Sequence, residues 1–303
     1  MTFNAQIKGN IHCHTTRTDG ECSVEAIQKL YKAKTYAFLA ITDHRIYFDE
    51  EGVSRDLILL NGCEYNCYLD HEAYDERIHF HLLTLKDPEQ DVSNRIEHDD
   101  NSYKSLFYTK LDEVQDLIDE LRSRGNLVII AHPKNPFIPI ELLKALRNYD
   151  GIEVYNAKSG QDASDYLFEL YQMRKTLLFT SVDDSHALLD DQGACEYFKG
   201  YIVVEDSATD KNKIVKAIKS KRFYASNGPE IYSLAVDENQ LTLQCSAVSK
   251  IELTVFSEEQ FETICFEEKD TLITALQYQF SKAMTHYSMI CIDDHGKKAW
   301  ISN

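Results

Sequence analysis

Histidines and carboxylates recur at short spacings along the first two thirds of this chain. His12 and His14 lie two residues apart, and Asp184 and His186 repeat that spacing further on. In an extended chain, alternate side chains point to the same side, so one cation can bind both members of such a pair. Nitrogen and oxygen ligands, with no obvious need for thiolate, suit Zn, Mn or Fe better than Ca or Mg. The spacing therefore predicts a site for divalent metal ions.

The candidate ligands accompany segments that the sequence predicts as strands. Up to about residue 225, short β-rich runs alternate with amphipathic stretches, which is typical of parallel strands joined by helical crossovers. Helical spacing is clearest over residues 24–31 and 111–121. The predicted strands are Ile7–Ile11, Phe38–Thr42, Leu57–Asn61, Ile78–Leu85, Leu127–Ala131, Gly151–Val154 and Leu177–Ser181. The alternation predicts the α/β fold class, and seven strands are enough to close a barrel.

Most of these strands end in, or contain, a side chain that can bind a metal. After His12 and His14, the candidates in chain order are Asp43 with His44, Glu64, His79 and His81, His132, and Asp184 with His186. The carboxyl ends of parallel barrel strands converge on one face, where such folds build their active sites. A lone histidine is more often a hydrogen-bonded structural residue, but several carboxylates buried together without cations are costly. The recurrence therefore favours one shared metal site.

The pattern of the sequence changes at Asn227-Gly228-Pro229, where turn residues mark a boundary. Beyond it, polar turns separate short apolar runs, which indicates an antiparallel β-sandwich. The predicted strands there are Ile231–Val236, Leu241–Cys245, Ile251–Phe256 and Tyr287–Ile292. We therefore expect a barrel domain over residues 1–228 and a small β-sandwich domain over residues 229–303.

The composition narrows the class of partner. The formal charge of −18 opposes binding to nucleic-acid backbones and to anionic membranes. A small molecule is therefore the expected partner, with nucleic acid expected only as a short oligonucleotide, and the oligomeric state is left open. Residues 1–8 lack the basic start and apolar core of a signal peptide, so the expected location is the cytoplasm. The eight cysteines form no C-x-x-C pair, which indicates reduced thiols rather than a zinc ribbon.

Short motifs occur along the chain in an order that identifies a family. They are NIHCHTTRTDG at 10–20, AITDHR at 40–45, GCE at 62–64, IHFHLL at 78–83, AHP at 131–133, GIEVYN at 151–156 and DDSH at 183–186. In this order they resemble the polymerase and histidinol phosphatase (PHP) family of metal-dependent phosphoesterases, over about residues 6–228. The stretch KRFYASNGPEIY at 221–232 resembles members that carry a small β domain after the barrel. The resemblance implies the PHP fold, a distorted (β/α)7 TIM-like barrel.

The same resemblance implies two or three divalent metal ions, with Glu64 as a bridging ligand. The implied ligands are His12, His14, Glu64 and Asp184 for the first ion, Glu64, His132 and either His79 or His81 for the second, and Asp19, His44 and His186 for the third. Some members carry a histidine in the place of Asp19. An aspartate there would weaken the third site.

The expected activity is hydrolysis of a small phosphomonoester or nucleotide by a hydroxide that bridges two cations, because coordination lowers the pKa of water toward about 7. The predicted catalytic residues are Glu64, Asp184 and His186, and the predicted phosphate-binding residues are Arg17, Arg45 and Lys134. One alternative is a phosphodiesterase or exonuclease that acts on oligonucleotide ends. Another is a metal-stabilised binding module without turnover. The phosphodiesterase or exonuclease is less favoured, because no basic and aromatic-rich stretch suited to single-stranded nucleic acid stands out.

Overall fold

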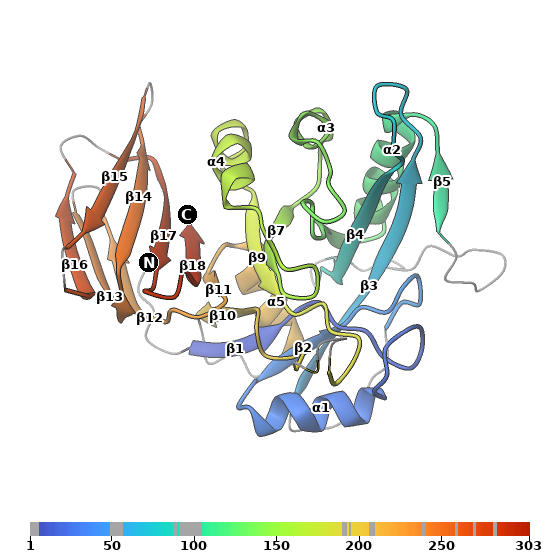
Figure 1. Ribbon diagram of the computed structural model, residues 1–303, viewed down its shortest axis with the longest axis horizontal. Coiled ribbons are helices and arrows are strands. Elements are labelled where there is room, and N and C mark those ends of the chain that lie inside the picture. The colour runs from blue at the N-terminus through green and yellow to red at the C-terminus, as the bar shows by residue number, and fades with distance from the viewer. Residues whose placement is uncertain are drawn as a thin grey trace.

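The computed structural model of this chain is a mixed α/β structure with one long sheet, one small sheet and few helices (Figure 1). The described residues are 6–48, 57–87, 90, 105–189, 193, 195–205, 210–237, 240–257, 260–268, 271–280 and 284–303. The predicted α/β class is confirmed.

Seven strands of the first part form one path through the long sheet. In spatial order they are β1 (Gln6–Asn10), β2 (Phe38–Ile41), β3 (Ile58–Leu69), β4 (Ile78–Lys86), β6 (Asn126–Ile130), β7 (Gly151–Asn156) and β9 (Leu178–Val182). Beyond β1 and β9, the chain segments meet at an isolated parallel bridge between Cys13 and Ser185. There the amide of Asp184 donates to the carbonyl of His12 at 3.0 Å. The two ends of the path are thus joined at the residues that carry the first and last metal-ligand motifs.

Strand β4 runs antiparallel to both β3 and β6, so the prediction of parallel strands throughout is wrong here. Only residues 70–77 separate β3 from β4, and a parallel crossover needs a dozen residues or more. Strand β3 is also longer than predicted, because it continues to Leu69 in pairing with β4 and with β5 (Leu106–Tyr108). As a result, Glu64 lies in the middle of β3 rather than at its end.

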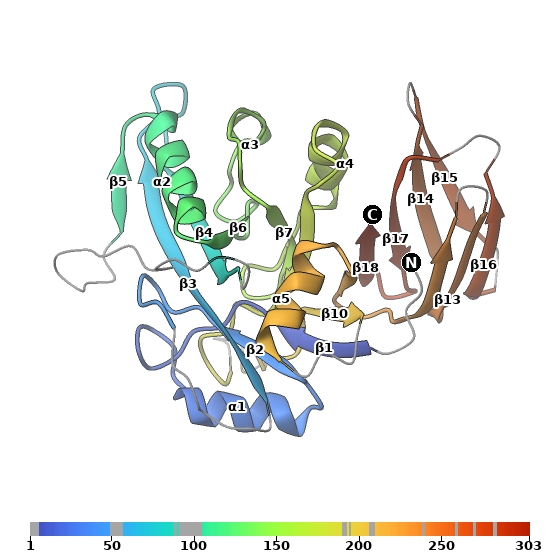
Figure 2. The same ribbon diagram turned by 180° about the vertical axis from the view of Figure 1, so that it is seen from behind.

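The helices pack apolar faces against the sheet. They are α1 (Val24–Ala33), α2 (Leu111–Ser123), α3 (Ile140–Ala145), α4 (Ser164–Met173) and α5 (Lys211–Lys219). Helices α1 and α2 confirm the two predicted from spacing. The hydroxyl of Ser23 accepts from the amide of Ala26 and caps α1, and the buried face of α2 lies against β6 and β3 (Figure 2). Among the described residues, none of the helices has the length and apolar character needed to cross a lipid bilayer.

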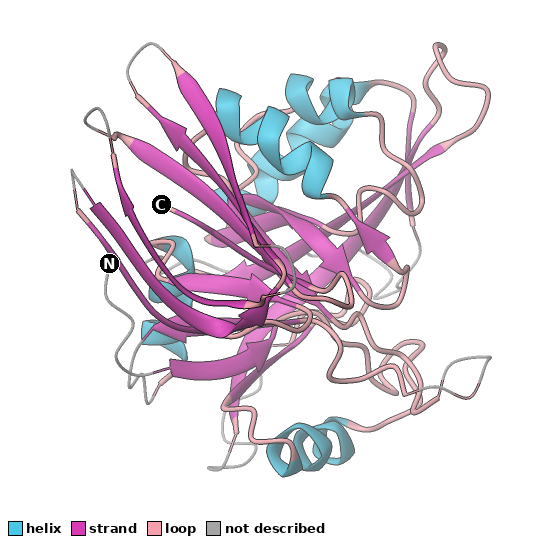
Figure 3. Cartoon of the chain, turned by 60° about the vertical axis from the view of Figure 1, so that its left-hand side comes forward, coloured by secondary structure: helices cyan, strands magenta, loops and turns pink. Residues whose placement is uncertain are grey.

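Antiparallel strands follow residue 229, as predicted, and lie in two layers (Figure 3). The small sheet contains β12 (Ile231–Val236), β13 (Gln240–Val248) and β16 (Ile273–Gln279), and the long sheet takes β14 (Lys250–Phe256), β15 (Phe261–Glu267), β17 (His286–Ile292) and β18 (Lys298–Ser302). Strand β18 pairs with β11 (Phe223–Ser226), which pairs with β10 (Tyr201–Glu205), and short β8 (Gln161–Asp162) pairs with β7. The long sheet therefore crosses residue 228, and the predicted domain division stays a prediction.

Candidate metal centre

One buried carboxylate, that of Glu64, lies at the centre of a histidine cluster. Its side chain is 1% exposed. Oxygen Oε1 lies 2.9 Å from His81 Nδ1, 3.3 Å from His12 Nε2 and 3.4 Å from His132 Nε2. Oxygen Oε2 lies 3.0 Å from His44 Nδ1 and 3.3 Å from His14 Nε2. The two oxygens thus face different sets of imidazoles, which is the arrangement that a bridging ligand requires.

The second carboxylate of the cluster, Asp184, faces His12 and His14. Its Oδ1 lies 3.2 Å from the Nε2 atoms of both, and those two nitrogens are 3.1 Å apart. Asp184 Oδ1, His14 Nδ1 and His44 Nδ1 are buried and make no hydrogen bond within the described part of the chain. Buried polar atoms are normally satisfied, so a group of such atoms without hydrogen bonds indicates a site for another partner.

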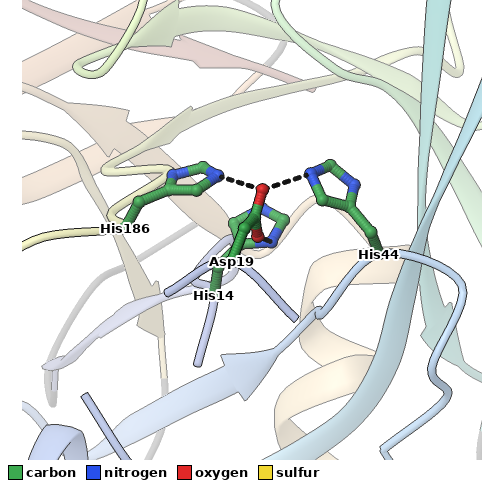
Figure 4. A group of neighbouring side chains, drawn as sticks. All are labelled: His14, Asp19, His44 and His186. Atoms are coloured by element: carbon green, nitrogen blue, oxygen red, sulfur yellow. Dashed lines mark ion pairs between the residues drawn. The ribbon is translucent and has the colours of Figure 1, made fainter. Parts of the chain in front are cut away.

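A third group of side chains lies on the more open side of the cluster (Figure 4). Asp19, 47% exposed, reaches between His44, His186 and His14, with closest oxygen–nitrogen distances of 3.3, 3.6 and 3.5 Å. His14 therefore contacts both this group and the Glu64 group.

Residues behind the cluster fix the orientation of its imidazoles. Glu153, on β7 and fully buried, accepts from His12 Nδ1 at 2.6 Å and from the amide of His132 at 2.8 Å. The Nδ1–H of His12 is thus used on Glu153, which leaves the Nε2 lone pair for the cluster. His186 Nδ1 likewise donates to the carbonyl of Asp184 at 2.9 Å and leaves Nε2 facing Asp19.

Sequence reasoning assigned no role to Glu153 or to Asn156, whose amide donates to Asp184 Oδ2 at 3.1 Å. Both lie in the motif GIEVYN, which contributes to the family resemblance but implies no ligand. A glutamate within an otherwise apolar strand was the available signal. The carboxylate of Glu196, which accepts from the amides of His186 and Ala187, lies in no motif and was missed altogether.

The cluster is electrostatically coupled. Burial by itself raises the pKa of Glu64, but His12, His81 and His44 outweigh it, and the pKa lies well below its ordinary value. Burial lowers the pKa of His44, yet the carboxylates of Glu64 and Asp19 outweigh burial and raise that pKa to about 10. The carboxylates likewise raise the pKa of His12, His14 and His132, so metal binding would have to displace protons from these imidazoles.

The backbone is strained at the cluster. Asp184, His132 and Arg45 have positive φ angles of 54°, 28° and 52°, which residues other than glycine rarely adopt. Such strain persists where the surrounding structure over-determines it, typically at functional sites. A single sequence carries no sign of it.

One predicted ligand, His79, lies outside the cluster. His79 packs edge-on against the ring of Tyr68, with centroids 4.3 Å apart, so of the two candidates on β4 the structure brings His81 and not His79 to Glu64. Lys134, which directly follows the AHP motif, forms an ion pair with Asp165 of α4, and its role in phosphate binding stays a prediction.

The two predicted phosphate-binding arginines follow ligand motifs. The guanidinium of Arg17 lies over Phe48, 5.6 Å from the ring centroid. The Nε of Arg45 is buried and makes no hydrogen bond to the described residues. Their role in phosphate binding stays a prediction.

The donor set fits metal ions. In three groups, one ligand atom from each residue lies within 4.8 Å of all the others, and these groups are His12, His14 and Glu64; His44, Glu64 and His81; and His14, Asp19, His44 and His186. Two ligands of a tetrahedral ion at about 2.1 Å lie about 3.4 Å apart, close to the distances between these atoms. The unsatisfied buried atoms of His14, His44 and Asp184 lie in or beside these groups.

Comparisons with known proteins give weak likenesses. No family model and no curated protein matches the chain. A two-domain protein from Bacteroides vulgatus ATCC 8482, said to contain a predicted PHP-like metal-dependent phosphoesterase, is 15% identical, with a TM-score of 0.47 over 99% of this chain and 95% of that one.

Two further solved structures are similar over part of this chain. A protein from Bifidobacterium adolescentis ATCC 15703, provisionally described as a metal-dependent phosphoesterase, is 16% identical, with a TM-score of 0.42 over 59% of this chain and 87% of that one. An amidohydrolase from Chromobacterium violaceum, solved with sulfate and no metal, is 15% identical, with a TM-score of 0.42 over 71% of this chain and 96% of that one. The first two descriptions agree with the family that the motifs resemble. At these identities and TM-scores, however, the likenesses carry no argument about the activity of this chain.

Proposed function

We propose that this chain is a metal-dependent phosphoesterase that hydrolyses a small phosphomonoester or nucleotide on a distorted (β/α)7 TIM-like barrel. The observation that carries the proposal is the Glu64 carboxylate, buried and in contact with five imidazoles through both of its oxygens. A structural buried carboxylate is normally satisfied by N–H and O–H donors of the chain. Five nitrogens around a single carboxylate form a ligand set.

The residues of the cluster have distinct roles in this proposal. Two or three divalent cations such as Zn, Mn or Fe would, when bound, polarise the phosphoryl oxygens and lower the pKa of water. Glu64 would be shared between one ion held by His12, His14 and Asp184 and another held by His81 and His132; His12 Nε2, which faces Oε1 together with His81 and His132, lies between the two ligand sets. Asp19, His44 and His186 would form the third ligand group. The chain itself orients two of these imidazoles, His12 through Glu153 and His186 through the carbonyl of Asp184.

A terminal phosphate on a small molecule is the proposed substrate. The deep position of Glu64, together with the charge of −18, disfavours a long polyanion. Because Asp19 is half exposed, its side of the cluster is the more open one, and a phosphoryl group would approach from there. A phosphodiesterase acting on oligonucleotide ends is the second candidate.

The test is ester hydrolysis by metal-reconstituted protein, followed as phosphate release from monoesters and as monoester formation from diesters. Metal-stripped protein would be loaded with Mn, Zn or Fe, its metal content measured, and a panel of phosphomonoesters and phosphodiesters assayed. We expect release from monoesters, its loss on chelation and its return with metal. Exposed His295 provides a matched control, because His295→Ala removes an imidazole without touching the cluster.

The outcomes separate the candidates. Hydrolysis confined to diesters or oligonucleotides would replace the first candidate with the second. Protein that retains at least two cations and hydrolyses no ester would overturn the proposal in favour of a metal-stabilised binding module.

A further inference from the structure

Three aromatic rings lie in a row on the face of the sheet that carries Glu64 and His81. On β3, Glu64 and Tyr68 are four residues apart, so their side chains share one face. Tyr68 pairs directly with His79 on β4 and with Phe107 on β5. Cross-strand partners share a face, so the ring row, Tyr68, His79 and Phe107, continues the face of the metal cluster.

The ring row is open, whereas the opposite face is core. Phe107 is 62% exposed, although burying such a ring would be favourable. Its ring is nearly parallel to that of Tyr68, at 16°, with centroids 5.1 Å apart. The alternate residues of the same strands, Cys67 and Phe80, are fully buried in the core that also takes the apolar side chains of α2. If these rings only stabilised the pairing of the strands, there would be no reason for Phe107 to be exposed to solvent.

A polar atom lies between the ring row and the cluster. Asn66, two residues from both Glu64 and Tyr68, donates from Nδ2 to Ser105 Oγ at 2.8 Å. Its Oδ1 is buried and accepts no hydrogen bond from the described residues. At the far end of the row, Arg77 lies 5.2 Å from the centroid of Phe107, held there by its bidentate pair with Asp70.

The spacing matches one small substrate. Side chains two residues apart on one face of a strand are about 7 Å apart, so the ring row begins about 7 Å from His81 and ends within about 15 Å. A phosphoryl group at Glu64 and a planar ring on the row can therefore belong to one molecule of nucleotide size. Asn66 Oδ1 would accept a hydrogen bond from the part between them.

We propose that Tyr68, His79 and Phe107 form a stacking subsite for a planar ring in the alcohol part of the substrate. The preferred ester then carries an aromatic or heteroaromatic ring, such as a nucleobase, rather than a sugar phosphate alone. Stacking on aromatic side chains tolerates many rings, and the guanidinium of Arg77 beside the row adds a cation–π partner. This subsite deepens the proposed phosphoesterase function and rests on it.

The experiment compares matched esters with and without the ring. Adenosine 3′- and 5′-monophosphates would be assayed against ribose 5-phosphate in protein reconstituted with Mn. We expect kcat/KM to favour the better adenosine ester by at least about tenfold. Phe107→Ala is expected to remove most of that preference through KM, and Phe107→Tyr, which keeps a ring, to retain it. Tyr232→Ala removes a comparably exposed ring on β12 and should leave the preference unchanged.

A binding measurement keeps the two proposals separable. Calorimetric titration of metal-stripped protein with adenosine, which has no phosphate, should show saturable binding that Phe107→Ala weakens about tenfold. Equal kcat/KM for esters with and without the ring would overturn the subsite and leave the phosphoesterase standing. If no ester is hydrolysed, the proposed function is wrong, and adenosine that also fails to bind overturns the subsite.

Discussion

Two buried carboxylates, Asp183 and Asp43, are bonded to donors of the chain, whereas two others, Asp184 and Glu64, face imidazoles. Asp183 accepts from the amides of Phe198, Lys199 and Gly200 at 2.7–2.8 Å and from the hydroxyl of Tyr31 at 2.6 Å. Its neighbour Asp184 faces imidazoles, and Oδ1 has no donor within the described residues. The same contrast separates Asp43, which is bonded to Thr15 and Thr18, from Glu64.

The difference shows how to tell a structural carboxylate from a candidate ligand. Burial raises the pKa of Asp183 to about 6, against the opposing effect of the N–H and O–H groups around it. Donors from the chain fill its lone pairs, so Asp183 needs nothing from outside. Glu64 and Asp184 are also buried, but they face imidazoles, which are themselves metal ligands, so bound cations can replace the imidazole protons that otherwise balance these carboxylates.

The largest effect is expected from removing the centre of the cluster. Glu64→Ala takes one carboxylate away from five imidazoles, and we expect kcat/KM to fall on the order of a thousandfold or more with the loss of bridged cations. Activity assays and metal analysis measure this, while circular dichroism should show the fold retained. Wild-type turnover in this variant would show that Glu64 is not a bridging ligand.

Next in size is the disruption of a structural carboxylate. Asp183→Asn presents an amide to three N–H donors, and we expect the free energy of unfolding of metal-free protein to fall by about 3 kcal/mol. Urea unfolding gives the value. A fall in the free energy of unfolding below about 0.5 kcal/mol would show that the donors around Asp183 do not stabilise the protein.

A smaller effect is expected at the open edge of the cluster. Asp19 is half exposed, so Asp19→Ala should remove at most one cation and lower kcat/KM about tenfold with little change in stability. Metal stoichiometry and steady-state kinetics test this together. Loss of every cation would show instead that Asp19 organises the whole site.

The smallest effect concerns the buried amine of Lys221. It donates to the carbonyl of Lys175, and burial beside the ammonium of Lys175 lowers the pKa of Lys221 to about 7. An unfolded lysine has a pKa of about 10.4, so between these values the unfolded chain binds a proton that the folded chain lacks. The free energy of unfolding should therefore rise by about 1 kcal/mol or more from pH 7 to pH 10. In Lys221→Met this contribution disappears, and an identical pH profile would refute the assigned pKa.

Residue spacing predicted many of the side chains that meet, whereas Asp19 came from the family resemblance alone. His12, His44, Glu64 and Asp184 come from four different strand ends or strands, and the structure brings them together. The rule about strand ends was only partly right, because it took every strand as parallel. His81 reaches Glu64 from near the start of β4, since β4 runs the other way.

The rest depended on pairings that one sequence does not encode. The choice between His79 and His81 required the register in which Glu64 lies opposite Leu83. The ion pair of Lys134 joins residues 31 positions apart. Strand β15 was missed because most of its residues are exposed, so no apolar run marks it.

Strand β18 has a practical consequence through Trp300, the single tryptophan of the sequence. Its indole is buried, donates to Ser164 Oγ at 2.9 Å, and lies where β18 joins β11 to β17. Emission from this one fluorophore therefore reports on the seam between the strands before and after residue 229. A red shift at a denaturant concentration where the cations are still bound would reveal that the seam opens first.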